Sequence, residues 1–277
     1  MHLNLKDGKL YYEYLDLQNT NLPTLLIIPG GPGLGFECYK PFFSQLEKHY
    51  SLIFFDQRGC GQSQGFEQTQ LNIYENIEDI ESLRAHLKIK NFHILGISYG
   101  AMIAFGYATK YAKNLSGLIT IGGAYNYHFI EKAKDNLKKI ASEKQINYAN
   151  KILWPGNFDN EYRIGEFFEV MGSLYSINQT HNNKKPSVTK ASIKPLNNAF
   201  QTDFWQFDFE KELSKINCPS LLISGQKDWI NDPIFAQNAH RLIKNSSFKL
   251  YNAGHSIMLD QPEQLLYDLK QFSLTLS

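Results

Sequence analysis

The stretch Phe92–Met102, FHILGISYGAM, joins an apolar run, a five-residue G-x-S-x-G pattern and the start of a helical segment. When a strand turns directly into a helix, side chains beside the turn collide with backbone, which accounts for Gly96 and Gly100. Such a turn exposes the hydroxyl of Ser98 at the N-terminus of the helix, where backbone amides face developing negative charge. The pattern therefore predicts that Ser98 is a nucleophile. The alternative is a glycine-rich turn with an N-capping serine.

A serine hydroxyl needs a general base, and that base needs an acid that orients it. After a strand–turn–helix nucleophile, the partners are expected in the order Asp or Glu and then His, each following a late strand. Asp228 follows the apolar run Leu221–Ser224, and His255 follows the run Phe248–Tyr251. We therefore predict that Ser98, His255 and Asp228 form a catalytic set.

Two other aspartates compete with Asp228 for the role of the acid. Asp232 directly precedes Pro233, and Asp260 lies two residues before Pro262. Both positions are typical of residues that cap the N-terminus of a helix. For this reason we prefer Asp228.

Acyl transfer also requires hydrogen-bond donors for the oxyanion. The backbone amide of Tyr99, next to the nucleophile, is one candidate, and the amide of Gly31 in the loop Pro29–Gly33 (PGGPG) is the other. An ordinary turn of glycine and proline is the alternative for this loop. A phosphate-binding loop is disfavoured because the Gly-Lys-Ser/Thr ending is absent. We expect no nucleotide, no metal and no organic cofactor.

Apolar runs and helix-like stretches alternate along most of the chain, which predicts a mainly parallel sheet with right-handed crossovers. Strands are expected at Lys9–Tyr14, Thr24–Ile28, Ser51–Phe55, Phe92–Leu95, Leu118–Ile121, Leu221–Ile223 and Phe248–Tyr251. Helices are expected at Tyr39–Lys48, Ile73–Leu87, Ala101–Lys110, Pro233–Leu242 and Pro262–Phe272.

The alternation stops between residues 125 and 210, where a lysine-rich helical stretch is followed by many aromatic residues. An insertion of this kind between two strands predicts a helical cap above the carboxyl edge of the sheet, where ligands bind in open α/β sheets. We therefore divide the chain into a core, residues 1–124 and 211–277, and a cap, residues 125–210.

Composition excludes several classes of protein. The chain carries 28 Lys and Arg against 27 Asp and Glu, so it has no basic surplus to neutralise nucleic-acid phosphates. No run approaches the roughly 18 apolar residues of a membrane-spanning helix, and the start does not resemble a signal peptide. Three scattered cysteines, Cys38, Cys60 and Cys218, suit a reducing cytoplasm better than a disulfide framework.

Taken together, the motifs resemble the proline iminopeptidase (prolyl aminopeptidase) family of α/β hydrolases. The matching segments are Gly30–Gly33 (GGPG), Asp56–Ser63 (DQRGCGQS), Asn76–Leu87, Gly96–Gly100, Asp228 and Ala253–Ser256 (AGHS). The resemblance implies an α/β-hydrolase fold, with a mainly parallel central sheet flanked by helices and an inserted helical cap. It also implies an enzyme that releases amino-terminal residues, typically proline, through an acyl-serine intermediate.

The chain departs from the family pattern at two positions. Pro29 stands where the family usually has histidine before the paired glycines, and Tyr99 stands where tryptophan often follows the serine.

The family reads the free amine of its substrate with carboxylates of the cap. The resemblance therefore makes Glu161, Glu166 and Glu169 candidate substrate contacts, although glutamates on solvated faces of a helix are the alternative. Gly30, Arg58 and Trp205 are further candidates, and Arg58 could instead hold its own loop through local hydrogen bonds.

The sequence thus predicts a cytoplasmic serine hydrolase whose partner is a small molecule or a short peptide. A peptide with a free amino terminus is the preferred substrate. An ester, lactone or small amide cleaved by the same three residues is the second possibility. Epoxides and haloalkanes are disfavoured, because their hydrolysis uses a carboxylate at the nucleophile position. A hydrolase scaffold that serves as a ligand receptor, with little turnover, is the third.

Overall fold

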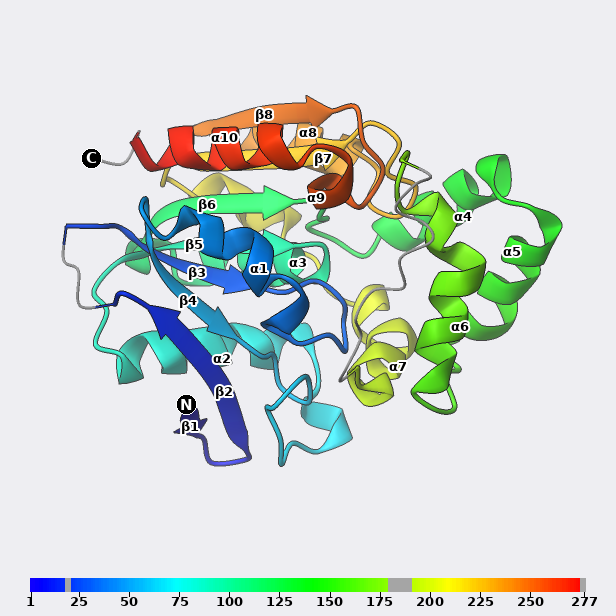
Figure 1. The fold of residues 1–277 in the computed structure, drawn as a ribbon, viewed down its shortest axis with the longest axis horizontal. Coiled ribbons are helices and arrows are strands. Elements are labelled where there is room, and N and C mark those ends of the chain that lie inside the picture. Colours follow the sequence, from blue (N-terminus) through cyan, green and yellow to red (C-terminus); the bar gives the residue numbers. More distant parts are fainter. Residues whose placement is uncertain (18–20, 179–190, 275–277) are drawn as a thin grey trace.

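The computed structural model describes residues 1–17, 21–178 and 191–274. Within these ranges eight strands form one sheet in the order β1-β2-β4-β3-β5-β6-β7-β8 (Figure 1). Strands β3 to β8 run parallel to their neighbours, and β1 and β2 join the sheet antiparallel. The predicted mainly parallel sheet is confirmed. The strands are β1 (His2–Asn4), β2 (Lys9–Leu15), β3 (Thr24–Ile28), β4 (Ser51–Phe55), β5 (Phe92–Ile97), β6 (Leu115–Ile121), β7 (Ser220–Gly225) and β8 (Ser246–Tyr251).

Helices cover both faces of the sheet, so its central strands are apolar on both sides. In β3, Leu25 and Ile27 belong to one buried cluster and Leu26 and Ile28 to another, as the two-residue period of a strand requires. The first cluster includes residues of α1 (Lys40–Phe43) and α10 (Pro262–Leu274). The second includes residues of α2 (Ile73–His86), α3 (Tyr99–Lys110) and α8 (Ile234–Leu242).

One predicted helix needs correction, and one strand lies where no strand is predicted. The helix expected at Tyr39–Lys48 is interrupted, because the four-residue α1 is flanked by separate 3₁₀ turns at Phe36–Cys38 and Ser44–Leu46. Strand β1 was not predicted, since a three-residue edge strand is too short for a periodic signal. The helix expected at Ile73–Leu87 is present as α2, and its N-cap Asn72 accepts a hydrogen bond from the amide of Glu75.

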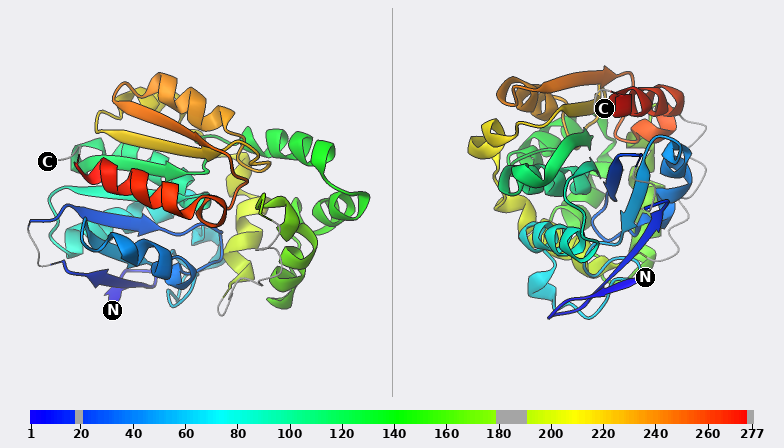
Figure 2. Two further views of the ribbon diagram at one scale, coloured as in Figure 1. Left: turned by 45° about the horizontal axis from the view of Figure 1, so that its top comes forward. Right: turned by 90° about the vertical axis from the view of Figure 1, so that its left-hand side faces the viewer.

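The chain between β6 and β7 contains helices α4 (Phe129–Ile140), α5 (Glu143–Tyr148), α6 (Tyr162–Met171) and α7 (Ile193–Gln201). These helices lie together beyond the carboxyl ends of the parallel strands (Figures 1 and 2). The division into a core, 1–124 and 211–277, and a cap, 125–210, stays a prediction. None of the helices within the described ranges is long and apolar enough to cross a membrane.

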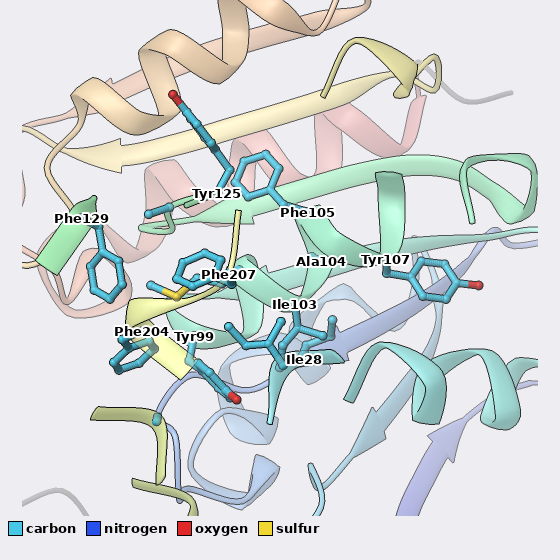
Figure 3. Packing of buried hydrophobic residues seen from close by; sticks show 14 of the residues in the cluster. Ile28, Tyr99, Ile103, Ala104, Phe105, Tyr107, Tyr125, Phe129, Phe204 and Phe207 are labelled. Carbon is cyan, nitrogen blue, oxygen red and sulfur yellow. The ribbon is translucent and has the colours of Figure 1, made fainter. Parts of the chain in front are cut away.

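Aromatic side chains join the inserted helices to the sheet. Phe204 packs edge-on against Phe129, with ring centroids 5.0 Å apart, and against Tyr99, at 5.7 Å. Figure 3 shows these rings beside Ile28 and Ile103, which belong to the same buried cluster. The insertion and the sheet therefore share one continuous apolar core on this side.

Candidate active site

Ser98 occupies the turn between β5 and α3 in a strained conformation, with φ 53° and ψ −115°. A Cβ atom at Gly96 would lie 2.2 Å from the carbonyl oxygen of Gly100, and one at Gly100 would lie 2.4 Å from the carbonyl oxygen of Ile28. Only glycine fits at both positions, which is the steric reason that the sequence pattern suggested. The tight turn places Ser98 at the carboxyl end of β5, where it lines a cavity.

The loops after β7 and β8 bring two further side chains to Ser98. Nε2 of His255 lies 3.0 Å from Oγ of Ser98, and Nδ1 lies 2.7 Å from Oδ2 of Asp228. An ionised carboxylate only accepts hydrogen bonds, so Nδ1 carries the proton and Nε2 is left to accept the serine proton. The three residues, which lie far apart in the sequence, thus form one hydrogen-bonded line.

Asp228 is held rigidly for this contact. Its side chain is buried, and Oδ1 accepts hydrogen bonds from the amides of Ile230, at 3.0 Å, and Asn231, at 2.9 Å. These bonds leave Oδ2 directed at the imidazole. The rival aspartates make other contacts: Asp232 accepts from the amide of Ile234, and Asp260 accepts from the amide of Gly254.

The residues predicted as oxyanion donors come from two different segments, and their role stays a prediction. Tyr99 begins α3 and Gly31 follows β3 with a φ of 141°, and both residues line the same cavity as Ser98 and His255. Gly30, in the same loop Pro29–Gly33, is absent from the described cavity lining, so the predicted substrate contact is corrected. A Cβ atom at Gly30 would be 3.3 Å from Cβ of Ser98 and 2.6 Å from the hydroxyl of Tyr39. The absence of a side chain at Gly30 therefore lets the loop approach the nucleophile.

The cavity above Ser98 has a volume of about 940 Å³. Its walls are mainly apolar and come from both the sheet edge and the inserted helices. Among the described lining residues the acidic side chains are Glu37 and Glu169. The aromatic residues of the inserted segment that line it are Phe129, Phe158, Phe167, Phe168, Tyr175, Phe200 and Phe204. The described residues contain no group of three or more His, Cys, Asp or Glu side chains arranged to hold a metal ion.

Comparison with known proteins agrees with this fold. Residues 23–262 match the family model described as alpha/beta hydrolase fold. The chain belongs to this family. Proline iminopeptidase PfmaB from Pestalotiopsis fici is 30% identical to this hydrolase over 259 residues, which cover 90% of each chain.

Solved structures with this fold include enzymes with different names. A proline iminopeptidase from Mycobacterium smegmatis aligns with a TM-score of 0.77 at 17% identity, covering 100% of this chain and 98% of that one. An esterase from Rhodococcus sp. aligns with a TM-score of 0.79 at 16% identity, with the same coverage. These structural likenesses establish the fold of the hydrolase, and the sequence comparison places it near proline iminopeptidases.

Arg58 does not take the place that we expected beside the substrate. It is absent from the described cavity lining, and its guanidinium is buried against Asp79, with Nε and Nη2 donating to the two carboxylate oxygens at 2.7 and 2.6 Å. The guanidinium carbon also lies 4.7 Å from the ring centroid of Phe66. The prediction of a substrate contact is therefore corrected, and of the two roles considered for Arg58 the structural one is favoured. A buried guanidinium is stable only when its donors are paired, and Asp79 provides that partner.

Three candidates on the inserted segment also lie outside the described lining. Glu161 is exposed, Glu166 forms an ion pair with Arg163 at 2.7 Å, and the indole Nε1 of Trp205 donates to a backbone oxygen of Phe200 at 2.7 Å. Of the three glutamates, only Glu169 lines the cavity. Helix α6 turns one side to the cavity, so neighbouring glutamates on it have different surroundings.

The structure adds positions that the sequence analysis missed. The ring of Tyr175 packs edge-on against the imidazole of His255, with centroids 5.5 Å apart. Asp203 accepts hydrogen bonds at Oδ2 from the hydroxyl of Tyr99 and from the amide of Ile73, both at 3.0 Å. No local pattern predicts these contacts. In contrast, the Asp-x-x-Asn spacing of Asp228 and Asn231 is a turn signal that could have been used.

We expect the carboxyl of Asp203 to make the stability of this hydrolase depend on pH. Burial raises the pKa of Asp203 to about 7, although the hydrogen bond from Tyr99 by itself lowers this pKa. The folded state thus binds the proton more tightly than the unfolded chain, so stability falls as pH rises from about 4 to about 7 and then levels off. Asp203→Asn keeps both hydrogen bonds on one oxygen and removes the titration. Between pH 5 and 8 we expect the wild type to lose on the order of 2 kcal/mol more stability than the variant.

Urea unfolding of both proteins at several pH values measures this difference. Asp135→Asn, which changes an exposed carboxylate of α4, is the matched control and should follow the wild type. Parallel pH curves for the wild type and Asp203→Asn would contradict the prediction.

Proposed function

We propose that this α/β hydrolase is a serine hydrolase that works through an acyl-enzyme. Oγ of Ser98 attacks the substrate carbonyl carbon while its proton passes to Nε2 of His255. The amides of Gly31 and Tyr99 receive the negative oxygen of the tetrahedral intermediate. As the intermediate collapses, the imidazolium gives the proton to the leaving group, and water then releases the acyl group by the same steps.

Asp228 supports this cycle by stabilising the imidazolium that forms on His255. Two backbone amides fix one of its carboxylate oxygens, so the other keeps its direction toward Nδ1 as the charge on the ring changes. The hydrogen-bonded line from Asp228 through His255 to Ser98, of which His255 and Ser98 line the cavity, is the observation that carries the proposal.

For the substrate we propose a short peptide with a free amino terminus, with proline as the first candidate for the released residue. Two observations support this choice. The relative with 30% identity over 90% of each chain is a proline iminopeptidase. Two exposed acidic residues, Glu169 and Glu37, also line the mainly apolar cavity and can supply an acidic partner for an ammonium group.

An esterase acting on a small acyl substrate is the second candidate. The aromatic walls of the cavity favour it, because an apolar acyl chain buries its surface there without a charged partner. The two candidates share the same three residues and differ in their need for a free amine.

A set of matched substrates separates these functions. Prolyl and other aminoacyl arylamides are compared with their N-acetylated forms and with simple aryl esters, after a fluorophosphonate probe has tested whether Ser98 is activated. We expect labelling by the probe and cleavage of the arylamide that fails once the amine is blocked. Equal cleavage of free and blocked arylamides would reject the aminopeptidase, and absence of labelling would favour a ligand receptor.

Glu169→Gln tests the proposed contact with the amine. Glu169 is exposed, and an exposed ion pair contributes about 0.2–1 kcal/mol, so KM for a free aminoacyl arylamide should rise up to about fivefold. Aryl esters, which carry no ammonium, should be hydrolysed as before. Steady-state kinetics of the wild type and the variant on both substrates measures this difference in KM between arylamide and ester.

Glu161→Gln is the matched control, because Glu161 precedes the same helix but lies outside the described cavity lining. Glu37→Gln tests in the same way whether Glu37, which lines the cavity from residues 1–124, contacts the amine. An equal rise of KM for arylamide and ester in Glu169→Gln would contradict an amine contact and indicate a change in cavity shape.

A further inference from the structure

The backbone on both sides of His255 is fixed by groups outside its own loop. The amide of Gly254 donates to Oδ2 of Asp260 at 2.8 Å, and the amide of Ser256 donates to the carbonyl oxygen of Tyr175 at 2.7 Å. Tyr175 belongs to the inserted segment, whereas Asp260 ends the short helix α9 (Ile257–Asp260). The imidazole is thus carried by a loop that two separate parts of the molecule hold.

The carboxylate of Asp260 also binds the chain that follows Tyr175. Oδ1 accepts hydrogen bonds from the hydroxyl of Ser176 and from the amide of Asn178, at 3.3 Å for the amide, and Oδ2 accepts from the amide of Ile177 at 3.2 Å. We name residues 175–178 the strap. Asp260 therefore ties the strap and the histidine loop together through both of its oxygens.

Steric contacts show that the strap lies directly on the histidine loop. A Cβ atom at Gly254 would lie 2.6 Å from the carbonyl oxygen of Tyr175 and 3.3 Å from Cα of Ser176. On the other side, a Cβ atom at Gly225, the last residue of β7, would lie 2.1 Å from the carbonyl oxygen of Gly254. The loop is enclosed between two backbones, so its position depends on where the strap is held.

We propose that Asp260 is a positioning residue that sets the place of His255 by bonding the adjacent Gly254 and by holding the strap against the loop. This inference rests on the proposed function, because it assigns a supporting part to the general base. The carboxylate is well suited to this role, since four donors converge on its two oxygens and fix both its orientation and the distance between strap and loop.

The strap also connects His255 to the cavity wall. Tyr175 packs edge-on against Phe167 and Phe168 of α6, at 5.9 and 6.2 Å between centroids, and both phenylalanines line the cavity. Packed rings thus connect the cavity wall, through Tyr175, to the imidazole of His255. Asp260 holds the residues that directly follow Tyr175. Loss of the Asp260 carboxylate should make the position of His255 less well defined, without removing any group that touches substrate.

Asp260→Asn tests the proposal at nearly constant size. Asparagine offers one acceptor oxygen, so in either orientation its NH2 group faces two of the four donors. Misplacing a catalytic group by about 1 Å can cost about 100-fold in rate, so we expect the fluorophosphonate labelling rate and kcat to fall about 10- to 100-fold. The final extent of labelling should equal that of the wild type, and KM should change little.

Asp232→Asn is the matched control. Asp232 also joins the inserted segment to the core, accepting from Nδ2 of Asn136 at 2.9 Å, but it binds neither strap nor histidine loop. It should label at the wild-type rate. Hydrogen exchange adds a readout that needs no turnover: Asp260→Asn should speed exchange in the peptide that carries Gly254 and Ser256, and Asp232→Asn should not.

The possible outcomes distinguish this inference from the proposed function. A reduced extent of labelling with an unchanged rate would mean that Asp260 only maintains the fold, and equal rates for the two variants would also overturn the inference. Either result would leave the serine hydrolase intact, because the wild type would still be labelled. Absence of labelling in the wild type would overturn both.

Discussion

Ser98→Ala should lower kcat by about 10⁴- to 10⁶-fold and abolish fluorophosphonate labelling, because the variant has no group that can form the acyl-enzyme. The weak remaining acceleration would come from the oxyanion donors and from binding alone. KM should stay near its wild-type value, since the hydroxyl contributes to the bond that forms and little to ground-state binding. Single-turnover kinetics and intact-mass analysis of the labelled protein measure these effects.

Non-additivity makes this test sharper. Nε2 of His255 lies 3.0 Å from the hydroxyl, so the two residues should act as one unit, and Ser98→Ala/His255→Ala should be no slower than either single variant. Ser173→Ala, which removes a hydroxyl that contacts Gln145 in the inserted segment, is the control and should label normally. Labelling that persists in Ser98→Ala would place the nucleophile at another residue.

Arg58→Met should have the largest effect on stability among the substitutions considered. Arg58 and Asp79 form a two-pronged ion pair, and each side chain is only 2% exposed. Removing the guanidinium leaves a buried carboxyl without its cation, which typically costs about 3–5 kcal/mol. Burial already raises the pKa of Asp79 to about 6 although Arg58 opposes the shift. Equilibrium denaturation of the variant at pH 7 measures the loss.

A double substitution separates the cost of breaking the ion pair from the cost of losing the packing of the Arg58 side chain. Arg58→Met/Asp79→Leu removes both charges and should recover part of the stability, because replacing a whole buried pair by apolar side chains is often nearly neutral. The folded fraction of Arg58→Met should hydrolyse substrate with an unchanged kcat, since Arg58 lies outside the described cavity lining. A stability loss below about 1 kcal/mol, the usual value of an exposed pair, would contradict this interpretation.

Much of the candidate site could be predicted because it depends on local sterics and strand order. The two glycines around Ser98 reflect collisions within a few residues, and the run Thr24–Ile28 has the pattern of a strand buried on both faces. Once strands and helices alternate, right-handed crossovers place the carboxyl ends of the parallel strands at one edge. Loops as distant as those of Asp228 and His255 then meet at Ser98.

Other positions depended on how distant helices and loops pack against one another. Arg58 pairs with Asp79 from α2, and Asp203 reaches Tyr99 across 104 residues of chain. Among the three glutamates near α6, only Glu169 faces the cavity. The sequence carries no periodic or spacing signal for such pairs, because each partner is ordinary in its own segment.

The order of Ser98, Asp228 and His255 along a strand–helix alternation was therefore enough to predict that their side chains meet in one hydrogen-bonded line, since short-range sterics and sheet topology leave few arrangements. The folded chain was needed to reveal what surrounds that line: the strap bound to Asp260, the buried carboxyl of Asp203 and the acidic residues that line the cavity. These contacts join residues far apart in sequence, and they arise from the fit between the inserted helices and the sheet, which no local pattern encodes.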